Sequence, residues 1–539
     1  MSTITNSDGK SAVASEPSSP RDLDADLIDW IARELSSEFR REYELPSTPP
    51  AQSVPPVHPF HQPPPPSATP SGAHKTDSAE TYPYGEPRSN GNLSSSPAPA
   101  SPSRQETPSS TSDYYFLRAS APSAAGLAPT APGVVDVASV RRDFPALHQT
   151  VNGRQLIWLD NAATTHKPQA VIDATSQFYS RDNSNIHRAA HTLAVRATDL
   201  FEGAREKVRR FLGAASAKEI VFVRGTTEGI NLVAQSYGRK NIGAGEEIIL
   251  TELEHHANIV PWQLLAEQTG AVIRVVPIND RGELILEEYA KWLGPRTKFV
   301  AVAHVSNALG TINPVEEIIA LAHARGVPVL VDGAQSAPHF PVNVTALDAD
   351  FFLFSAHKVF GPTGIGALYG KAPLLEAMPP WQGGGHMIKE VRFEKTTYQN
   401  ASEKFEAGTP DIAGVVGLGA ALDYLAKVGL PAIAAYEHSL LQYATEALST
   451  IPGLRPIGTA ANKASVLSFI IPGVSNESIA RHLDQNGIAV RAGHHCAQPA
   501  HRRFGLESSV RPSLAFYNTR EEVDALVRTL RPLGRNSRL

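Results

Sequence analysis

Short apolar runs alternate with amphipathic stretches from about residue 138 onward. Apolar runs bounded by turn-forming residues predict strands, whereas apolar side chains at every third or fourth position predict helices. The predicted strands lie at 219–223, 247–251, 272–277, 298–305, 328–332 and 348–354, and the predicted helices at 192–212, from 228, around 262–265, at 286–293 and at 314–325. These repeated units indicate an α/β fold with a large, mainly parallel sheet and helices on both faces.

A smaller α/β unit is predicted after residue 410. Residues 413–428 have the pattern of a helix, and 465–471 and 513–517 have that of strands. We therefore predict a large domain at 138–410, followed at 411–539 by a linking helix and a small C-terminal domain. Cys496 falls on a loop of the small domain, so a site that uses it would span both domains.

Residues 1–135 differ in composition from the rest, because Pro, Ser, Ala and small polar residues dominate. Such a segment cannot bury enough apolar surface to offset its ordering entropy, and we predict a disordered extension. Two islands interrupt it: 22–45, with apolar side chains on one helical face, and the aromatic cluster 112–117. Both islands could be docking elements for a partner. Alternatively, the helix packs on the folded part of the same chain and the aromatic cluster has no function.

Composition excludes several classes of protein. The net charge of −5 over 539 residues gives no electrostatic case for nucleic acid or a membrane surface. No run approaches the roughly 20 apolar residues of a membrane span, and the first residues lack the pattern of a signal peptide, so we expect a cytoplasmic protein. The single cysteine excludes disulfides within the chain.

Lys358 follows the apolar run 351–354 and precedes a glycine-rich turn. A lysine there either extends its charge to water or is desolvated, and a desolvated amine is a nucleophile suited to Schiff-base chemistry. Asp332 ends another strand, where a carboxylate can keep a pyridine nitrogen protonated. Thr226 and Thr227 stand between a strand and a helix, as a phosphate seat requires. Together they predict a pyridoxal phosphate site, although Asp332 and the threonines could also be helix caps.

The predicted strand ends collect further polar groups. Thr227, His255, Asn307, Asp332 and Lys358 each follow an apolar strand, and ligands of such sheets lie beyond the carboxyl ends of the strands. His255 and His256 are adjacent without a third spaced ligand, so we expect no metal site.

Cys496 lies beside two histidines and near Arg491. These neighbours favour a reactive thiolate, whereas a lone cysteine in a large chain is more often an inert buried residue.

Six motifs occur in the order found in one family: 160–165 (DNAATT), 224–231 (RGTTEGIN), 254–258 (EHHAN), 332–335 (DGAQ), 355–358 (SAHK) and 491–499 (RAGHHCAQP). Over residues 138–535 the chain resembles the SufS-like cysteine desulfurases of the class V aminotransferases. The resemblance implies the type I fold of pyridoxal-phosphate enzymes, preceded here by the extension.

The resemblance also implies a role for each site residue. Lys358 is similar to the Schiff-base lysine, and His255 to the imidazole that stacks on the ring and carries a proton. Asp332 and Gln335 resemble the partners of the ring nitrogen and ring oxygen. The remaining residues resemble phosphate contacts (Thr226, Thr227, Ser355 and His357), a phosphate contact from the second subunit of a homodimer (Thr409), substrate-carboxylate ligands (Asn307 and Arg511), and a substrate-binding arginine near the cysteine loop (Arg491).

The implied reaction converts L-cysteine to L-alanine and leaves the sulfur as a persulfide on Cys496, from which a separate acceptor protein draws it. Selenocysteine lyases and cysteine-sulfinate desulfinases share this framework. Two competing functions are an aminotransferase in which Cys496 is incidental, and a scaffold with a vestigial catalytic domain. The extension is similar in architecture to that of desulfurases loaded into encapsulin shells, so we expect a location in the cytoplasm or inside such a compartment.

Overall fold

The computed structural model describes residues 134–187 and 190–536. The predicted extension at 1–135 lies outside these residues except for its last two positions, and so do the predicted docking elements at 22–45 and 112–117. The large sheet, the C-terminal unit and the predicted site residues all lie within the described part.

Seven strands form the large sheet, and six of them run in one direction. In spatial order they are β4 (Ile220–Val223), β10 (Gly366–Gly370), β9 (Phe351–Ser355), β8 (Val329–Asp332), β7 (Thr297–Ala303), β5 (Glu247–Thr251) and β6 (Val272–Val276). β10 is antiparallel to both β4 and β9, whereas the pairs from β9 to β6 are parallel. The predicted large, mainly parallel sheet is therefore confirmed.

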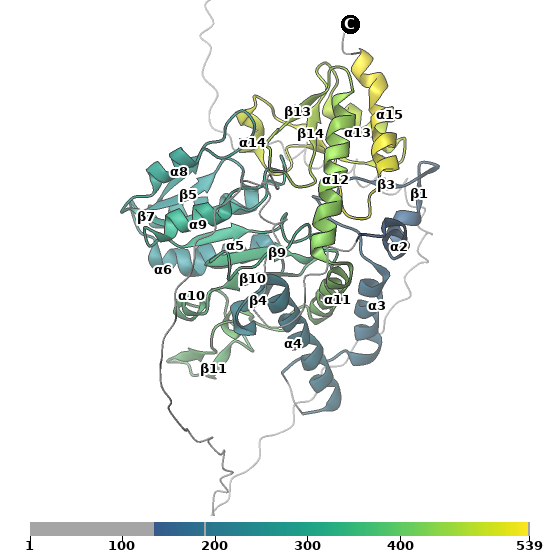
Figure 1. The fold of residues 1–539 in the computed structure, drawn as a ribbon. Helices are drawn as coiled ribbons and strands as arrows, with labels where there is room; N and C mark the ends of the chain where they lie inside the picture. Colours follow the sequence, from purple (N-terminus) through teal and green to yellow (C-terminus); the bar gives the residue numbers. More distant parts are fainter. Residues whose placement is uncertain (1–133, 188–189, 537–539) are drawn as a thin grey trace, which may run out of the picture. The chain divides into compact units, whose positions relative to one another are not determined.

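Helices cover both faces of this sheet (Figure 1). The helices up to residue 377 are α2 (Val137–Arg142), α3 (Gln169–Gln177), α4 (Thr192–Leu212), α5 (Thr226–Val233), α6 (Arg239–Asn241), α7 (Val260–Thr269), α8 (Leu286–Trp292), α9 (Val315–His323) and α10 (Ala372–Ala377). The next two are α11 (Ile412–Val428), which packs on α3 and α4, and α12 (Leu430–Ser449).

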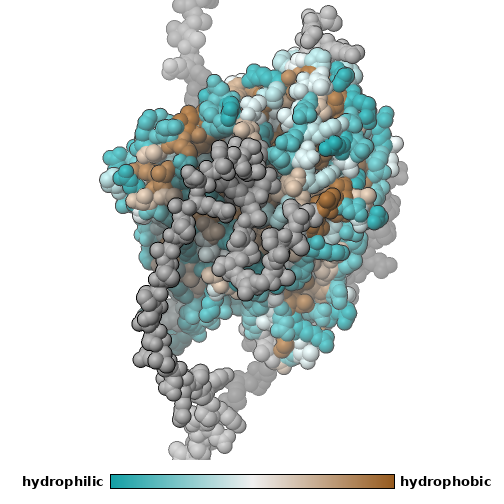
Figure 2. Space-filling view, in the orientation of Figure 1, coloured by the Kyte–Doolittle hydropathy of each residue, from teal (hydrophilic) through white to brown (hydrophobic). Residues whose placement is uncertain are grey.

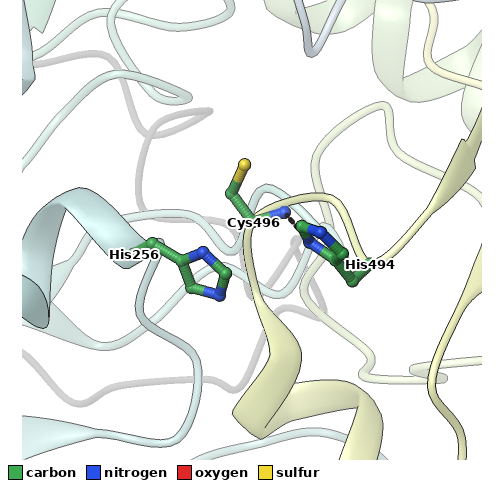
Figure 3. A group of neighbouring side chains, drawn as sticks. All are labelled: His256, His494 and Cys496. Atoms are coloured by element: carbon green, nitrogen blue, oxygen red, sulfur yellow. Dashed lines mark hydrogen bonds between the residues drawn. The ribbon is translucent and has the colours of Figure 1, made fainter. Parts of the chain in front are cut away.

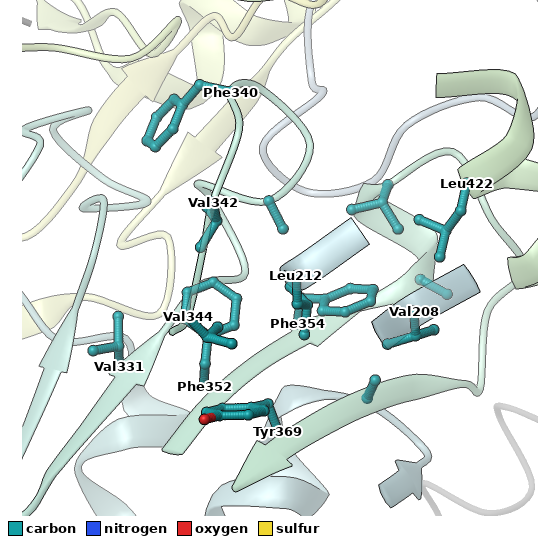
Figure 4. Packing of buried hydrophobic residues seen from close by; sticks show 14 of the residues in the cluster. Val208, Leu212, Val331, Phe340, Val342, Val344, Phe352, Phe354, Tyr369 and Leu422 are labelled. Carbon is teal, nitrogen blue, oxygen red and sulfur yellow. The ribbon is translucent and has the colours of Figure 1, made fainter. Parts of the chain in front are cut away.

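Alternate side chains of β9 enter different cores. Phe352 and Phe354 pack with Val208 and Leu212 of α4 on one face (Figure 4). Phe351 and Leu353, together with other residues, form the core on the opposite face. Successive side chains of a strand point to opposite faces, so an unbroken apolar run is what a strand covered on both sides requires.

The C-terminal unit is built on a separate antiparallel sheet. Its order is β13 (Arg455–Ile457), β14 (Ser468–Ile470), β17 (Ser509–Arg511) and β16 (Arg491–Gly493). The helices of this unit are α13 (Asn476–Asp484), α14 (Gln498–Arg503) and α15 (Arg520–Asn536). The predicted strand at 513–517 is wrong: β17 ends before Pro512, which has no N–H to donate, and only isolated bridges of Ser513 follow it.

One early segment pairs with this C-terminal unit. β3 (Ile157–Trp158) is parallel to β15 (Ile488–Ala489). A division of the chain at residue 410 remains a prediction, and β3 crosses it. The remaining short strands are β1 (Thr150–Val151), β2 (Arg154–Gln155), β11 (Ile388–Val391) and β12 (Thr396–Tyr398).

The surface visible in Figure 2 is mostly hydrophilic, with hydrophobic residues in small separate groups. Within the described ranges, no single helix is long and apolar enough to cross a bilayer. The pair α11 and α12, bent by 73° at their junction, meets that criterion only when the two are taken together.

Candidate active site

The carboxyl ends of the large sheet and the loop before α14 enclose one cavity. Its lining includes every predicted site residue except Thr409: Thr226, Thr227, His255, Asn307, Asp332, Gln335, Ser355, His357, Lys358, Arg491, Cys496 and Arg511. The side chains come from both units of the chain. The cavity therefore combines residues on both sides of the predicted division at residue 410.

Lys358 ends a short 3₁₀ helix, Ala356–Lys358, that follows β9. Burial lowers the pKa of its amine to about 8, and the Asp332 carboxylate partly opposes this effect. Asp332 ends the neighbouring strand β8 and is buried, so desolvation raises the pKa of its carboxyl group, although the Ala334 N–H donates to it over 2.9 Å. The site therefore holds an amine that loses its proton easily and a buried carboxyl group.

The start of α5 forms a cradle with the end of β9. The Thr226 N–H donates to Ser355 Oγ over 2.9 Å, and the two hydroxyl groups lie 3.0 Å apart. A Cβ at Gly225 would stand 3.1 Å from Ser355 Oγ, so only glycine leaves this corner open without crowding. The first amides of a helix have no intrahelical partner, and with these hydroxyl groups they can bind a phosphate.

His255 precedes the 3₁₀ helix His256–Asn258, and its Nδ1 accepts the Ala257 N–H over 3.0 Å. Burial, followed by the charge of Lys358, lowers the pKa of this imidazole to about 3. The ring is therefore neutral at neutral pH, with Nε2 left to carry its proton.

Gln335 and His357 are both anchored to the 160–165 segment. Gln335 is buried, and its Nε2 donates to the Ala162 carbonyl over 2.7 Å. His357 Nδ1 lies 3.2 Å from Thr164 Oγ1. Burial lowers the pKa of His357 to about 4, so this ring is also neutral.

Arg511 is almost fully buried, and two groups fix its guanidinium. Its terminal nitrogens donate to Asp160 Oδ1 and to the Asn307 carbonyl, both over 3.0 Å. Within the described part of the chain, neither Arg511 Nε nor Asn307 Oδ1 has a hydrogen-bond partner. Unpaired buried polar atoms are rare, so these two are candidate contacts for a bound ligand.

The Cys496 loop has an unusual backbone. His495 has φ 52° and Cys496 has φ 55°, a left-handed conformation that costs a non-glycine residue about 1 kcal/mol or more. The Cys496 carbonyl accepts the His256 N–H over 2.7 Å, and the Cys496 N–H donates to His494 Nδ1 over 3.0 Å. These bonds hold Cys496 at the cavity across the junction of the two units.

Sequence reasoning did not name Asp160 as a site residue and treated His495 only as a neighbour of Cys496. Asp160 orients Arg511, and the signal for it was available, because it follows the short strand β3 as other site residues follow theirs. His495 lines the cavity, with its Nε2 against Ser509. Only its position beside Cys496 pointed to it.

Thr409 lies elsewhere. It is exposed, lines a separate hollow and accepts a hydrogen bond from Asn185 over 3.3 Å. Thr409 therefore does not line the Lys358 cavity in this chain.

The donor set fits pyridoxal phosphate. The cavity contains an amine for the aldehyde, a buried carboxyl group for the ring nitrogen and a phosphate cradle. The open corner at Gly225 leaves space beside the cradle for such a ligand. The unpaired atoms of Arg511 and Asn307 are free to form hydrogen bonds with it or with a bound amino acid. Residues Lys358, Asp332, Thr226 and Ser355 would hold the group.

A family model for class V aminotransferases matches residues 157–526. The chain belongs to the aminotransferase class-V family, so pyridoxal phosphate is the expected cofactor. Within this family the chain is similar to cysteine desulfurases.

Three relatives illustrate the similarity. A cysteine desulfurase of Synechococcus elongatus is 63% identical over 402 residues, which cover 75% of this chain and 64% of that protein. A probable cysteine desulfurase of Vibrio cholerae is 51% identical over 394 residues, covering 73% and 97% of the two chains. The crystal structure of the cysteine desulfurase CsdA from Escherichia coli has a TM-score of 0.69 at 45% identity and covers 74% of this chain and 98% of its own. These similarities confirm the predicted family and fold class.

The length of the match differs among relatives. The chain spans only 63% to 66% of the length of three curated relatives that are 57% to 63% identical to it.

Proposed function

We propose that the chain is a pyridoxal-phosphate-dependent cysteine desulfurase. It would convert L-cysteine to L-alanine and retain the sulfur as a persulfide on Cys496. The observation that carries this proposal is that Lys358 and Cys496, 138 residues apart in the numbering, line the same cavity. The amine can move a proton at the substrate Cα, and the thiol can receive the substrate sulfur.

Each residue then has a defined task. Arg511 binds the substrate carboxylate through its unpaired Nε–H, whereas the unpaired Asn307 Oδ1 can only accept and would receive an N–H group of the bound amino acid. Pyridoxal phosphate, when bound, supplies an electron sink for the pair left at Cα. Lys358 takes the Cα proton, and Cys496 attacks the substrate sulfur as a thiolate. The Cβ–S bond breaks, its electron pair and a proton end on carbon, and the sulfur is oxidised to a persulfide. His255, neutral and with Nε2 available, carries protons in this sequence.

Arg511→Lys is expected to raise the KM for L-cysteine by about 10- to 100-fold, with a smaller effect on kcat. Lysine keeps the charge but cannot offer two parallel N–H groups to a carboxylate, and one charge-assisted hydrogen bond contributes roughly 1.5–3 kcal/mol. Steady-state alanine release measures this change. Arg154→Lys, at an exposed position, serves as the control, and an unchanged KM in Arg511→Lys would remove the arginine from the substrate site.

Uptake of pyridoxal phosphate by the cofactor-free protein is expected to quicken with pH, with a midpoint near pH 8. Only the unprotonated amine attacks an aldehyde, and the pKa of Lys358 is lowered from 10.5 to about 8. Stopped-flow absorbance gives the midpoint of this profile. Asp332→Asn should move the midpoint down, because the Asp332 carboxylate raises the pKa of Lys358. A wild-type midpoint near 10.5 would contradict the buried position of this amine.

The proposal includes a homodimer in which Thr409 of one copy reaches the site of the other. Exposed apolar side chains on α3 and α4 support an interface there: Ile172, Leu193, Val195 and Leu200 are 39% to 44% exposed. α3 and α4 both pack on α11, so these helices belong to one helical layer. Sedimentation analysis of the purified chain tests this stoichiometry, and a monomer with full turnover would exclude the shared site.

The acceptor of the sulfur, a location in the cytoplasm and loading into an encapsulin shell are further parts of the proposal. For shell loading, the support is the composition of residues 1–135 and its two apolar islands. Deleting residues 1–133, which leaves the buried Val135 in place, is expected to keep turnover unchanged and to abolish co-purification with a co-expressed shell protein. If turnover is lost in this truncation, the extension is part of the enzyme instead.

A further inference from the structure

Three side chains with metal-binding atoms meet at the Cys496 loop (Figure 3). Cys496 Sγ and one nitrogen each of His256 and His494 lie within 4.8 Å of one another. His256 belongs to the connection between β5 and α7, whereas His494 and Cys496 belong to the loop between β16 and α14. Of the three, Cys496 alone lines the Lys358 cavity, so the two imidazoles lie near the thiol without belonging to that cavity.

We infer that His256, His494 and Cys496 bind one Zn²⁺ ion through two imidazole nitrogens and a thiolate. This combination of ligands is typical of zinc, whereas Mg²⁺ and Ca²⁺ require oxygen ligands. Three protein ligands leave the fourth position of a tetrahedral ion open to water or to a small thiol. The prediction of no metal site from the sequence considered only the adjacent pair His255 and His256, while the other two ligands lie about 240 residues further on.

The present geometry is close to that of a zinc site. Bond lengths of about 2.0–2.1 Å to nitrogen and 2.3 Å to sulfur place tetrahedral ligand atoms about 3.3–3.6 Å apart. The three atoms must therefore approach by at most about 1.2–1.5 Å, which rotation of the exposed His494 and of the half-buried His256 and Cys496 side chains can supply. The imidazoles already stack with centroids 5.5 Å apart and 27° between their planes.

Each imidazole has a backbone hydrogen bond to exchange. His494 Nδ1 accepts the Cys496 N–H over 3.0 Å, and His256 Nε2 accepts the Gln498 N–H over 3.3 Å. Zinc binding either replaces one of these bonds or uses the second nitrogen of the ring after its proton moves.

Binding changes no oxidation state. Zn²⁺ displaces the thiol proton, which leaves to solvent, and a Zn–S bond forms. If the chain transfers sulfur as proposed above, the ion also holds the nucleophile that receives this sulfur. Zinc would then stop sulfur transfer reversibly, without displacing pyridoxal phosphate.

The test uses the full-length protein loaded with pyridoxal phosphate, titrated with Zn²⁺ against a chromophoric chelator. L-cysteine is left out, because it binds zinc itself. We expect one ion per chain in the wild type. His256→Ala and His494→Ala should each weaken binding by more than about 100-fold, because even partners that only orient a ligand contribute about 10- to 100-fold. His148→Ala, which removes an exposed histidine elsewhere, should bind zinc as the wild type does.

Cobalt gives an independent readout. Co²⁺ in the wild-type protein should show the visible bands of a tetrahedral ion with a thiolate ligand, and Cys496→Ser should lose the thiolate contribution. Mg²⁺ should not compete. Equal zinc affinity in His494→Ala and the wild type, or no zinc bound against the chelator, would overturn the site.

Activity separates this inference from the proposed function. Zinc added before substrate should inhibit the wild type, whereas the turnover of His256→Ala and of His494→Ala, each compared with the same variant in zinc-free buffer, should not change. A wild type that binds zinc at this group but releases no alanine would refute the proposed function and leave the site intact. Turnover without any zinc binding would support the proposed function and overturn the zinc site.

Discussion

Cys496→Ala is expected to form no persulfide and to release alanine from L-cysteine about 1,000-fold more slowly, or slower still, while keeping the absorbance of bound pyridoxal phosphate. The thiol is the group that receives the sulfur, whereas the cradle around Thr226 and the carboxyl group of Asp332 do not involve it. Losing a nucleophile removes interactions made only in the transition state, so the effect falls on kcat.

The same variant separates the competing enzymes. An aminotransferase of this family that uses Cys496 only for packing would keep its turnover with an amino acid and a keto acid. Assays of alanine, sulfane sulfur and keto-acid-dependent transamination, run on the wild type and Cys496→Ala, therefore give different patterns for the two activities. Retained alanine release in Cys496→Ala would refute the desulfurase mechanism.

Lys358→Ala is expected to abolish the covalent attachment of pyridoxal phosphate and to lower turnover by about 1,000-fold or more. This lysine is the amine beside Asp332 in the cavity, and it both holds the cofactor and moves the Cα proton. Borohydride reduction followed by mass spectrometry should show the cofactor on a wild-type peptide and not on the variant. The cofactor should still bind non-covalently, because its phosphate contacts remain.

Lys463 provides a matched control for this experiment. Burial lowers the pKa of its amine to about 8 as well, but it lies in the loop between β13 and β14, outside the cavity lining. Lys463→Met should keep both the covalent cofactor and the activity. If reduction labelled Lys463 instead, a lowered pKa alone would explain the attachment, and the arrangement at the end of β9 would not be needed.

Most of the large sheet could be predicted from local sequence. β9 and β8 are short apolar runs that end in polar residues, and their carboxyl ends meet at one edge, so Lys358 and Asp332 could be placed together from the sequence alone. The His255 position followed from the same reasoning at the end of β5. In these cases the end of one strand determines where the residues that end it or follow it closely lie.

Other features depend on partners that local sequence does not specify. Ile157 and Trp158 form a good strand, but nothing in them selects β15 rather than the large sheet. Likewise, the run 366–370 does not reveal that it enters the sheet antiparallel. The residues at 513–517 are as apolar as a strand because they are buried, although Pro512 has already ended the ladder. At 513–517, burial without strand pairing produces the same apolar run that a strand would.

The contact between Asp160 and Arg511 spans 351 residues of sequence. At a ribosomal rate of about 5–20 residues per second, Arg511 emerges roughly 20 to 70 s after Asp160. During that interval β3 has no β15 to pair with, and an unpaired strand edge is open to mispairing. Cys496 is also made near the end, when the sheet that carries Lys358 is complete. A ribosome that stalls before β15 would therefore release a chain that lacks its thiol, leaves β3 unpaired and is a natural client for a chaperone.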